Sequence, residues 1–275
     1  MGRFVLAFVA AFIACSQAGF ADEAKEKADR PDIGAMLQEN HYYLAIGPSL
    51  APDYEGSGDY SAFPLLIARW QRGGHFVEFE GHTLRANLVP ASLFQAGPVL
   101  LLRQGRQGVS DDRINRMRHV RNAIEAGGFI GLQIRDPNEL RRYANLWLQV
   151  VSDVSGVNNG YDARLMLRTG GPLPGPWTID TEIFSDYGNA NYMDSYFSID
   201  ADDAARSGLP QFHASAGFRD VGINVMLTYH FSDHWGLGAI AEYKRMLGDG
   251  ADSPVVGLAG TADQFVGALT VTYQY

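Results

Sequence analysis

The chain has 275 residues, of which 46% are hydrophobic and 19% charged, and its formal net charge of -9 argues against nucleic acid as a partner. No window reaches the roughly 20 apolar residues of a membrane-spanning helix, so a helical membrane protein is excluded. A β-barrel is not excluded, because half of its strand positions face a polar interior. The sole cysteine is Cys15, so no intramolecular disulfide can form.

Residues 1–21 have the pattern of a cleaved export signal. Arg3 supplies a positive charge, residues 4–14 are apolar, and a small-x-Ala pattern ends at Ala21. The alternative is a lipoprotein signal acylated at Cys15, although the residues before it match that motif poorly. Residues 22–40 are charged and lack strand periodicity, which predicts a periplasmic tail. The predicted domains are thus a signal peptide (1–21), a tail (22–40) and a barrel (41–275).

From residue 42 onward, apolar and polar residues alternate with the period of a β-strand. The first strand starts at Tyr42, the second covers 63–70, and another covers 94–104. Residues 75–89 between them form either a hairpin that turns at 81–82 or one long bent strand.

Residues 105–122 predict a loop that carries a short helix. Ser110 and Asp111 can cap it, and Ile114 and Met117 follow at helical spacing. A local basic patch is formed by Arg113, Arg116, Arg118 and Arg121. A solvated loop helix is the preferred interpretation, and contact with the phosphates of lipopolysaccharide is the alternative.

Three hairpins and a closing strand follow. The hairpins turn at 136–138, at 172–176 and at 232–234, and the closing strand is 265–275. The strand before the last of these turns is predicted to run from Phe212 to Phe231, with a bulge at 219–220.

The loop lengths give the number of strands. Bacterial barrels have an even number of strands, short periplasmic turns and long outer loops. We count the strands back from Tyr275. All long connections then lie at one end of the barrel and all short ones at the other only if 75–89 is a hairpin. We therefore predict an all-β, antiparallel transmembrane β-barrel with 12 strands, the alternative being 10. A periplasmic aromatic girdle is expected from Tyr229, Phe231, Trp235, Tyr273 and Tyr275.

Charged residues on the inferred inward faces are the candidate lumen lining. They are Arg164, Arg168, Asp180, Glu182, Glu242 and Lys244. Arginine and carboxylate positions face each other across the predicted hairpin, which favours a structural ladder of ion pairs. A selectivity lining for a channel is the alternative.

Little points to catalysis. His213 and Ser215 share one face of a predicted strand, a spacing seen in an outer-membrane phospholipase, but no third orienting group is apparent. The seven histidines are scattered, and the acidic clusters lack the spacing of an EF-hand. We expect a protein that is not an enzyme and that needs no metal or cofactor.

Several stretches together resemble the MipA/OmpV family of outer-membrane proteins. They are APDYEGS (51–57), SGLP (207–210), DVG (220–222), LGD and ADSP within 247–254, and the closing strand 265–275. The resemblance implies a location in the Gram-negative outer membrane, in contact with its lipid and lipopolysaccharide. It also implies a scaffold that docks a lytic transglycosylase and a penicillin-binding protein, a narrow porin-like channel being the alternative function.

The closing strand has a further expected role. Terminal strands that end in an aromatic residue resemble the signal read by the barrel-assembly machinery, which is thus a predicted partner. The residues in question are Leu269, Val271, Tyr273 and Tyr275.

Overall fold

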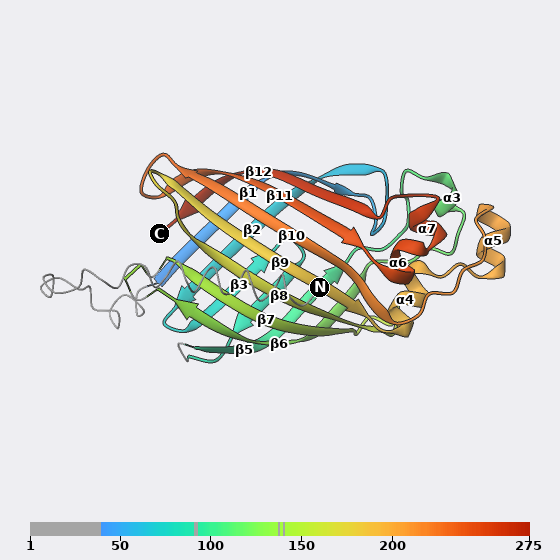
Figure 1. Ribbon diagram of the computed structural model, residues 1–275, viewed down its shortest axis with the longest axis horizontal. Helices are drawn as coiled ribbons and strands as arrows, with labels where there is room; N and C mark the ends of the chain where they lie inside the picture. The colour runs from blue at the N-terminus through green and yellow to red at the C-terminus, as the bar shows by residue number, and fades with distance from the viewer. Residues whose placement is uncertain (1–39, 91–92, 137, 140) are drawn as a thin grey trace, which may run out of the picture. The chain divides into compact units, whose positions relative to one another are not determined.

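Alternating inward and outward side chains build twelve antiparallel strands that close into a barrel (Figure 1). The computed structural model describes residues 40–90, 93–136, 138–139 and 141–275. The predicted signal peptide, the alternative acylation at Cys15 and nearly all of the predicted tail lie outside these residues. The strands are β1 (Asn40–Pro52), β2 (Tyr60–Arg72), β3 (His75–Glu80), β4 (Thr83–Asn87), β5 (Phe94–Arg103), β6 (Ala123–Arg135), β7 (Tyr143–Asp153), β8 (Tyr161–Pro172), β9 (Trp177–Gly188), β10 (Gly217–His230), β11 (Trp235–Met246) and β12 (Asp263–Gln274).

The prediction of twelve strands is confirmed, and so is the hairpin at 75–89. Each strand pairs with its neighbours in the chain, and β1 pairs with β12 to close the wall. The two chain segments that meet there are held by a reciprocal pair of backbone bonds, because Tyr42 N donates to Tyr275 O at 2.9 Å and Tyr275 N donates to Tyr42 O at 2.9 Å. The predicted bulge appears as a register shift between Phe218 and Asp220.

One connection differs from the prediction. The strand expected from Phe212 begins only at Gly217, and Phe212 forms a single bridge with Ile199 instead. His213 and Ser215 are therefore not strand residues, and the shared face that their spacing suggested does not exist. The side chain of His213 is largely exposed.

The outer surface of the wall is apolar, and its two rims are aromatic. Ile46, Ile130 and Leu269 are each more than half exposed. At one rim Trp177 contacts Tyr229, and Trp235 contacts Tyr273, each at 5.0 Å between ring centroids. At the other rim the aromatic residues are Tyr60, Tyr161, Tyr187, Phe218, Tyr243 and Phe265, at the opposite ends of their strands. Two aromatic girdles around an apolar band are typical of a barrel seated in an outer membrane.

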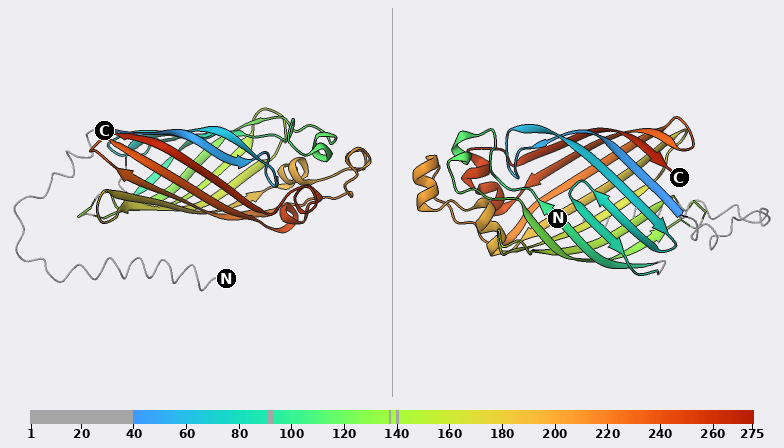
Figure 2. Two further views of the ribbon diagram at one scale, coloured as in Figure 1. Left: turned by 90° about the horizontal axis from the view of Figure 1, so that it is seen from above. Right: turned by 180° about the vertical axis from the view of Figure 1, so that it is seen from behind.

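The long connections gather at one end of the barrel, which we call the loop end, and the tight turns and Tyr275 lie at the other, the turn end (Figures 1 and 2). The loop end carries α3 (Asp112–Asn115), α4 (Ala190–Phe197), α5 (Ala201–Ser207), α6 (Gly248–Asp252) and α7 (Pro254–Gly257). Among the described residues, none of the helices has the length and apolar character needed to cross a bilayer. By the rule of short periplasmic turns, the turn end faces the periplasm and the loop end faces outward.

The helices of the loop end pack on buried cores of their own. α3 is the helix expected after Asp111, whose side chain accepts a hydrogen bond from Arg113 N. One core includes Tyr192, Met193 and Phe197 of α4. A second joins Tyr54, Ile114, Met117, Ile199, Leu209, Val255 and Ala259. The loop end is therefore a folded cap.

Candidate functional site: a charge-filled lumen

Inward-facing charged side chains form two groups inside the barrel. The turn-side cluster consists of Arg69, Glu78, Glu80, Arg85, Arg168 and Glu182. The loop-side cluster consists of Glu55, Arg103, Glu125, Asp162, Arg164, Asp186, Arg219, Asp220 and Lys244. Both draw residues from strands far apart in the sequence, so they tie the wall together across its interior.

Arg168 is the side chain that crosses the lumen in the turn-side cluster. It faces Glu182 directly in the β8–β9 register and pairs with it. It also contacts Glu78 at 3.2 Å and Glu80, both on β3, although β4 to β7 separate β3 from β8 in the barrel. One guanidinium therefore joins two sides of the wall.

Glu78 is the centre of the same cluster. Its carboxylate lies 2.7 Å from Arg69 Nη1 and 2.8 Å from Arg85 Nη1, in addition to the contact with Arg168. Glu78 and Arg85 are both buried. Removing a partner from such a group leaves an uncompensated buried charge, so the cluster holds its members in fixed positions.

Aromatic side chains complete the packing between these charges. Trp147 is fully buried and donates from Nε1 to Gln95 Oε1 at 2.8 Å. The guanidinium carbons of Arg85 and Arg168 lie 5.0 Å and 5.3 Å from the centre of its ring. Phe76 and Phe129 stack beside it. This part of the lumen is thus occupied by packed side chains.

Arg219 is the centre of the loop-side cluster and is 1% exposed. Four carboxylates lie within 3.4 Å of it, and they belong to Glu55, Asp162, Asp186 and Asp220. The hydroxyl of Tyr192 on α4 donates to Glu55 Oε2 at 3.0 Å, which connects the cap to the lumen. Burial acts to raise the pKa of Glu55, but Arg219 and Lys244 outweigh it and lower that pKa to about 2.

The six lumen residues singled out in the sequence do not form one ladder, although Glu182 is shared by Arg168 and by Arg164, whose Nη1 lies 3.8 Å from Glu182 Oε1. Arg168 pairs with Glu182, and Arg164 Nε lies 2.7 Å from Asp186 Oδ1, its direct neighbour in register. The remaining three do not join these pairs on the β8–β9 hairpin. Asp180 accepts from Tyr143 at 2.6 Å, Glu242 accepts from Asn224 at 3.2 Å, and Lys244 Nζ lies 3.0 Å from Glu55 Oε1.

Sequence reasoning missed the centres of both clusters, Glu78 and Arg219. Glu78 lies in the stretch whose strand assignment was ambiguous, and Arg219 lies at the bulge, where alternation no longer shows which way a side chain points. Parity with Glu80 is the signal that could have suggested an inward position for Glu78, whereas parity gave no such signal at Arg219. Some of their partners, such as Arg168 for Glu78 and Glu55 for Arg219, come from distant parts of the chain, and no local pattern identifies those.

Three arginines of the basic patch, Arg113, Arg116 and Arg118, are engaged with nearby protein groups. Arg113 Nη2 lies 2.6 Å from Asp111 Oδ2, and Arg118 Nε lies 3.6 Å from Asp203 Oδ2. Arg116 Nε donates to the carbonyl of Arg206 at 3.0 Å. These contacts favour the loop-helix interpretation over a free basic patch for lipopolysaccharide phosphates.

The described part of the chain holds no group of three His, Cys, Asp or Glu side chains arranged to bind a metal ion. The carboxylates of the two clusters are already opposed by arginine and lysine. These opposed charges favour a rigid arrangement of the lumen side chains.

A family model described as MltA-interacting protein MipA matches residues 44–275. This chain belongs to the MipA family. The match covers every strand from β2 to β12 and most of β1, so it includes both the barrel and its cap. An outer-membrane location agrees with this membership and with the girdled apolar surface.

No curated protein sequence matches this MipA-family chain. Among solved structures, it is similar to an outer-membrane channel of Pseudomonas putida F1, with 10% identity, a TM-score of 0.42, and coverage of 90% of this chain and 100% of that one. It is also similar to OmpT, an outer-membrane protein of Vibrio cholerae, with 6% identity, a TM-score of 0.38, and coverage of 86% and 97%. The outer-membrane channel DcaP of Acinetobacter baumannii gives 9% identity, a TM-score of 0.34, and coverage of 86% and 96%. Scores at this level say nothing about function.

Proposed function

We propose that this MipA-family barrel is a non-enzymatic docking protein for periplasmic enzymes that remodel peptidoglycan. A lytic transglycosylase is the first expected partner, and a penicillin-binding protein is the second. The description of the family supports the first, since it names an interaction with MltA.

The observation that carries the proposal is the packed lumen. Arg168, Glu78 and Trp147 occupy the turn side of the interior, and Arg219 with its carboxylates occupies the loop side. A porin keeps a water-filled channel between its walls. The filled interior therefore favours a rigid docking protein over the alternative function, a narrow porin-like channel.

The surface available to a periplasmic partner is limited. It comprises the tight turns of the turn end, such as 73–74 and 232–234, and the segment 22–40 that precedes β1. This segment is charged and is the longer of the candidates, so we assign it the main share of docking.

Deletion of residues 23–39 tests this assignment. We expect a several-fold lower recovery of a purified lytic transglycosylase on the immobilised barrel, because the charged segment is removed while the wall is untouched. A variant with the same 17 residues in shuffled order controls for length and charge. Equal capture by all three forms would exclude the segment as the docking site. Discrete conductance steps in planar bilayers would favour the channel instead.

A further inference from the structure

The wall of the barrel has a gap at its loop end, between β2 and β5. The hairpin of β3 and β4 fills only the part nearest the turn end, and it turns at Gly81 and His82. Its last backbone bonds to the neighbouring strands are Gly81 N to Leu66 O at 3.0 Å and Leu102 N to His82 O at 2.9 Å. β2 continues for six residues beyond Leu66, from Leu65 to Tyr60, and in the described part of the chain no strand pairs with that side of it.

The free edge of β2 is adapted to remain unpaired. Leu66 directs its carbonyl toward β3, so the residues two and four positions before it, Pro64 and Ala62, direct their backbone groups the same way. Pro64 has no N–H to offer, and proline is common on strand edges that must not recruit another strand. The gap is thus built into the wall.

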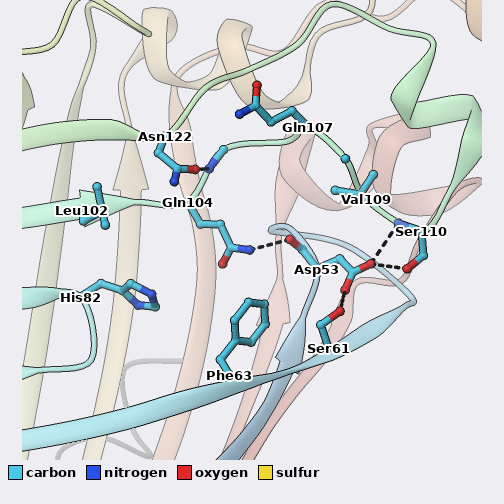
Figure 3. Close-up of a pocket in the computed structure, with 12 residues that line it drawn as sticks. Asp53, Ser61, Phe63, His82, Leu102, Gln104, Gln107, Val109, Ser110 and Asn122 are labelled. Carbon is cyan, nitrogen blue, oxygen red and sulfur yellow. Dashed lines mark hydrogen bonds between the residues drawn. The ribbon is translucent and has the colours of Figure 1, made fainter.

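A cavity of about 520 Å³ occupies the gap, and residues from both faces of the wall line it (Figure 3). Phe63 belongs to the inward-facing set of β2, whereas Leu102 points outward and is 44% exposed. His82 forms the lower boundary. Because inner and outer positions share one cavity, the cavity is a window through the wall. Intact ladders separate strands by about 4.8 Å, so the two absent strands leave roughly 14 Å between β2 and β5.

Asp53 joins the two sides of the window by hydrogen bonds. Its Oδ1 accepts from Ser61 Oγ of β2 at 2.5 Å, and its Oδ2 accepts from Ser110 Oγ at 2.5 Å and from Ser110 N at 3.1 Å. Its backbone carbonyl accepts from Gln104 Nε2 at 2.8 Å. The dashed lines of Figure 3 show these bonds converging on one residue. We call this set the Asp53 clasp.

The window lies at the level of the outer leaflet. Ser61 and Phe63 come directly after Tyr60, which belongs to the loop-end aromatic girdle. On the other side Leu102 is paired with Ile124, and both are exposed on the outer surface. Because the residues around the opening are apolar and lie near the aromatic girdle, the opening faces lipid acyl chains and head groups.

The lining determines what the window can bind. Phe63, Leu102 and Val109 offer apolar contact, and Gln104, Gln107 and Asn122 supply side-chain amides. Among the described residues, those that line the cavity include neither lysine nor arginine, and Asp53 is the one acidic residue there. An anionic ligand would meet a carboxylate without a compensating cation, whereas hydroxyl groups suit the amides.

We propose that this window is a lateral binding site for a neutral amphiphile that comes from the outer leaflet, with an apolar chain and a hydroxylated head group. The apolar chain contacts Phe63 and Leu102, and the head group bonds to the side-chain amides of Gln104, Gln107 and Asn122. The site uses none of the residues proposed for docking, and neither proposal depends on the other.

Binding of radiolabelled hexyl glucoside to the full barrel in phosphatidylcholine nanodiscs tests the proposal. We expect one saturable site per barrel above the level of empty discs, and no competition from hexyl sulfate, which has the same chain and an anionic head. His82→Trp fills the window and should lower the affinity at least fivefold. His75→Trp makes the same change at the turn end of the same hairpin and should leave binding unchanged. Equal binding to empty and loaded discs, or to both variants, would overturn the proposal.

A second arm examines the lateral route without relying on ligand affinity. In a Cys15→Ser background, a nitroxide at Phe63→Cys should collide more often with molecular oxygen than with a water-soluble nickel complex. A nitroxide at Leu258→Cys, on an exposed position of the cap, should show the reverse ratio. Heat-modifiable migration on gels establishes that each variant is folded. A water-like ratio at position 63 would mean that the window does not open to lipid.

Discussion

Asp53 shows how much one side chain can hold together. It joins the end of β1 to β2 and to the β5–β6 loop through Ser61, Ser110 and Gln104. Burial acts to raise the pKa of Asp53, but the hydrogen bonds from Ser110 and Ser61 outweigh it, and the pKa lies below its ordinary value of 3.8. A depressed pKa in the folded state means that the clasp stabilises the protein above the ordinary value and loses this effect as the pH falls through the folded-state pKa.

Asp53→Asn should therefore destabilise the barrel by about 1.5–3 kcal/mol at pH 7, because hydrogen bonds to a charged acceptor are replaced by bonds to a neutral one. The measurement is urea unfolding from lipid vesicles, repeated at pH 7 and near pH 2. The difference from wild type should shrink at acid pH. Asp59→Asn alters an exposed neighbour in the same loop and serves as the control. A difference that stays constant with pH would show that the carboxylate charge is not what matters.

Arg168→Met should cost about 3–5 kcal/mol, since it leaves Glu78, Glu80 and Glu182 inside the barrel without their shared cation. Arg245→Met breaks a matched pair with Asp263 at 2.6 Å on the exposed rim, where both side chains are nearly half exposed. Screening by water limits that loss to about 1 kcal/mol or less. Unfolding in vesicles compares the two, and equal losses would contradict a structural role for the lumen pair.

At the scale of elements, the strands were predictable and most of the helices were not. A strand such as β6 alternates over thirteen residues, so its period of two is visible in the sequence, and its outward Ile130 and inward Glu125 follow from parity. α6 and α7 have five and four residues, which is too short for a helical period to appear. Helices of this length depend on packing within the cap, and the local sequence does not reveal that packing.

The ion pairs of the lumen clusters were also predictable only where local sequence determines them. The facing of Arg168 and Glu182 could be anticipated because a tight turn sets the register of their hairpin. The contact of Arg168 with Glu78 requires the barrel to close, because the two strands meet only across the interior. Local alternation thus predicts which side chains point inward, but closure decides which of them meet.

Gly47 marks a close approach between β1 and β12. A Cβ at this position would lie 1.8 Å from the carbonyl oxygen of Leu269 on the facing strand. Gly47→Ala should therefore strain the closing pair of strands and cost about 1–3 kcal/mol. Gly267→Ala, on β12 in the same ladder, has no heavy atom within 4 Å of the added carbon and is the matched control. On gels, we expect a smaller heat-modifiable fraction for Gly47→Ala than for Gly267→Ala. Equal fractions would show that β1 and β12 can shift to accommodate the added methyl group.

For the molecule as a whole, assembly is where the closing strand should matter. Tyr275 ends the chain beside Tyr42, and Leu269, Val271 and Tyr273 face outward with it. We expect Tyr275→Lys to lower insertion into outer membranes several-fold, since it removes the terminal aromatic residue that the assembly machinery is proposed to read. Leu258→Lys adds the same charge at an exposed position of the cap and should insert normally. Normal amounts of heat-modifiable Tyr275→Lys would refute the role of that residue.

The cap sets an order of events in folding. Its second core brings Tyr54 from the first long loop against Val255 from the last, and the Tyr54 hydroxyl donates to the Val255 carbonyl at 3.4 Å. These residues are distant in the chain and become neighbours only when β1 and β12 have met. Contacts of such separation form late. The outer end of the molecule is therefore completed after the wall, so a protease-resistant cap would report a finished barrel during biogenesis.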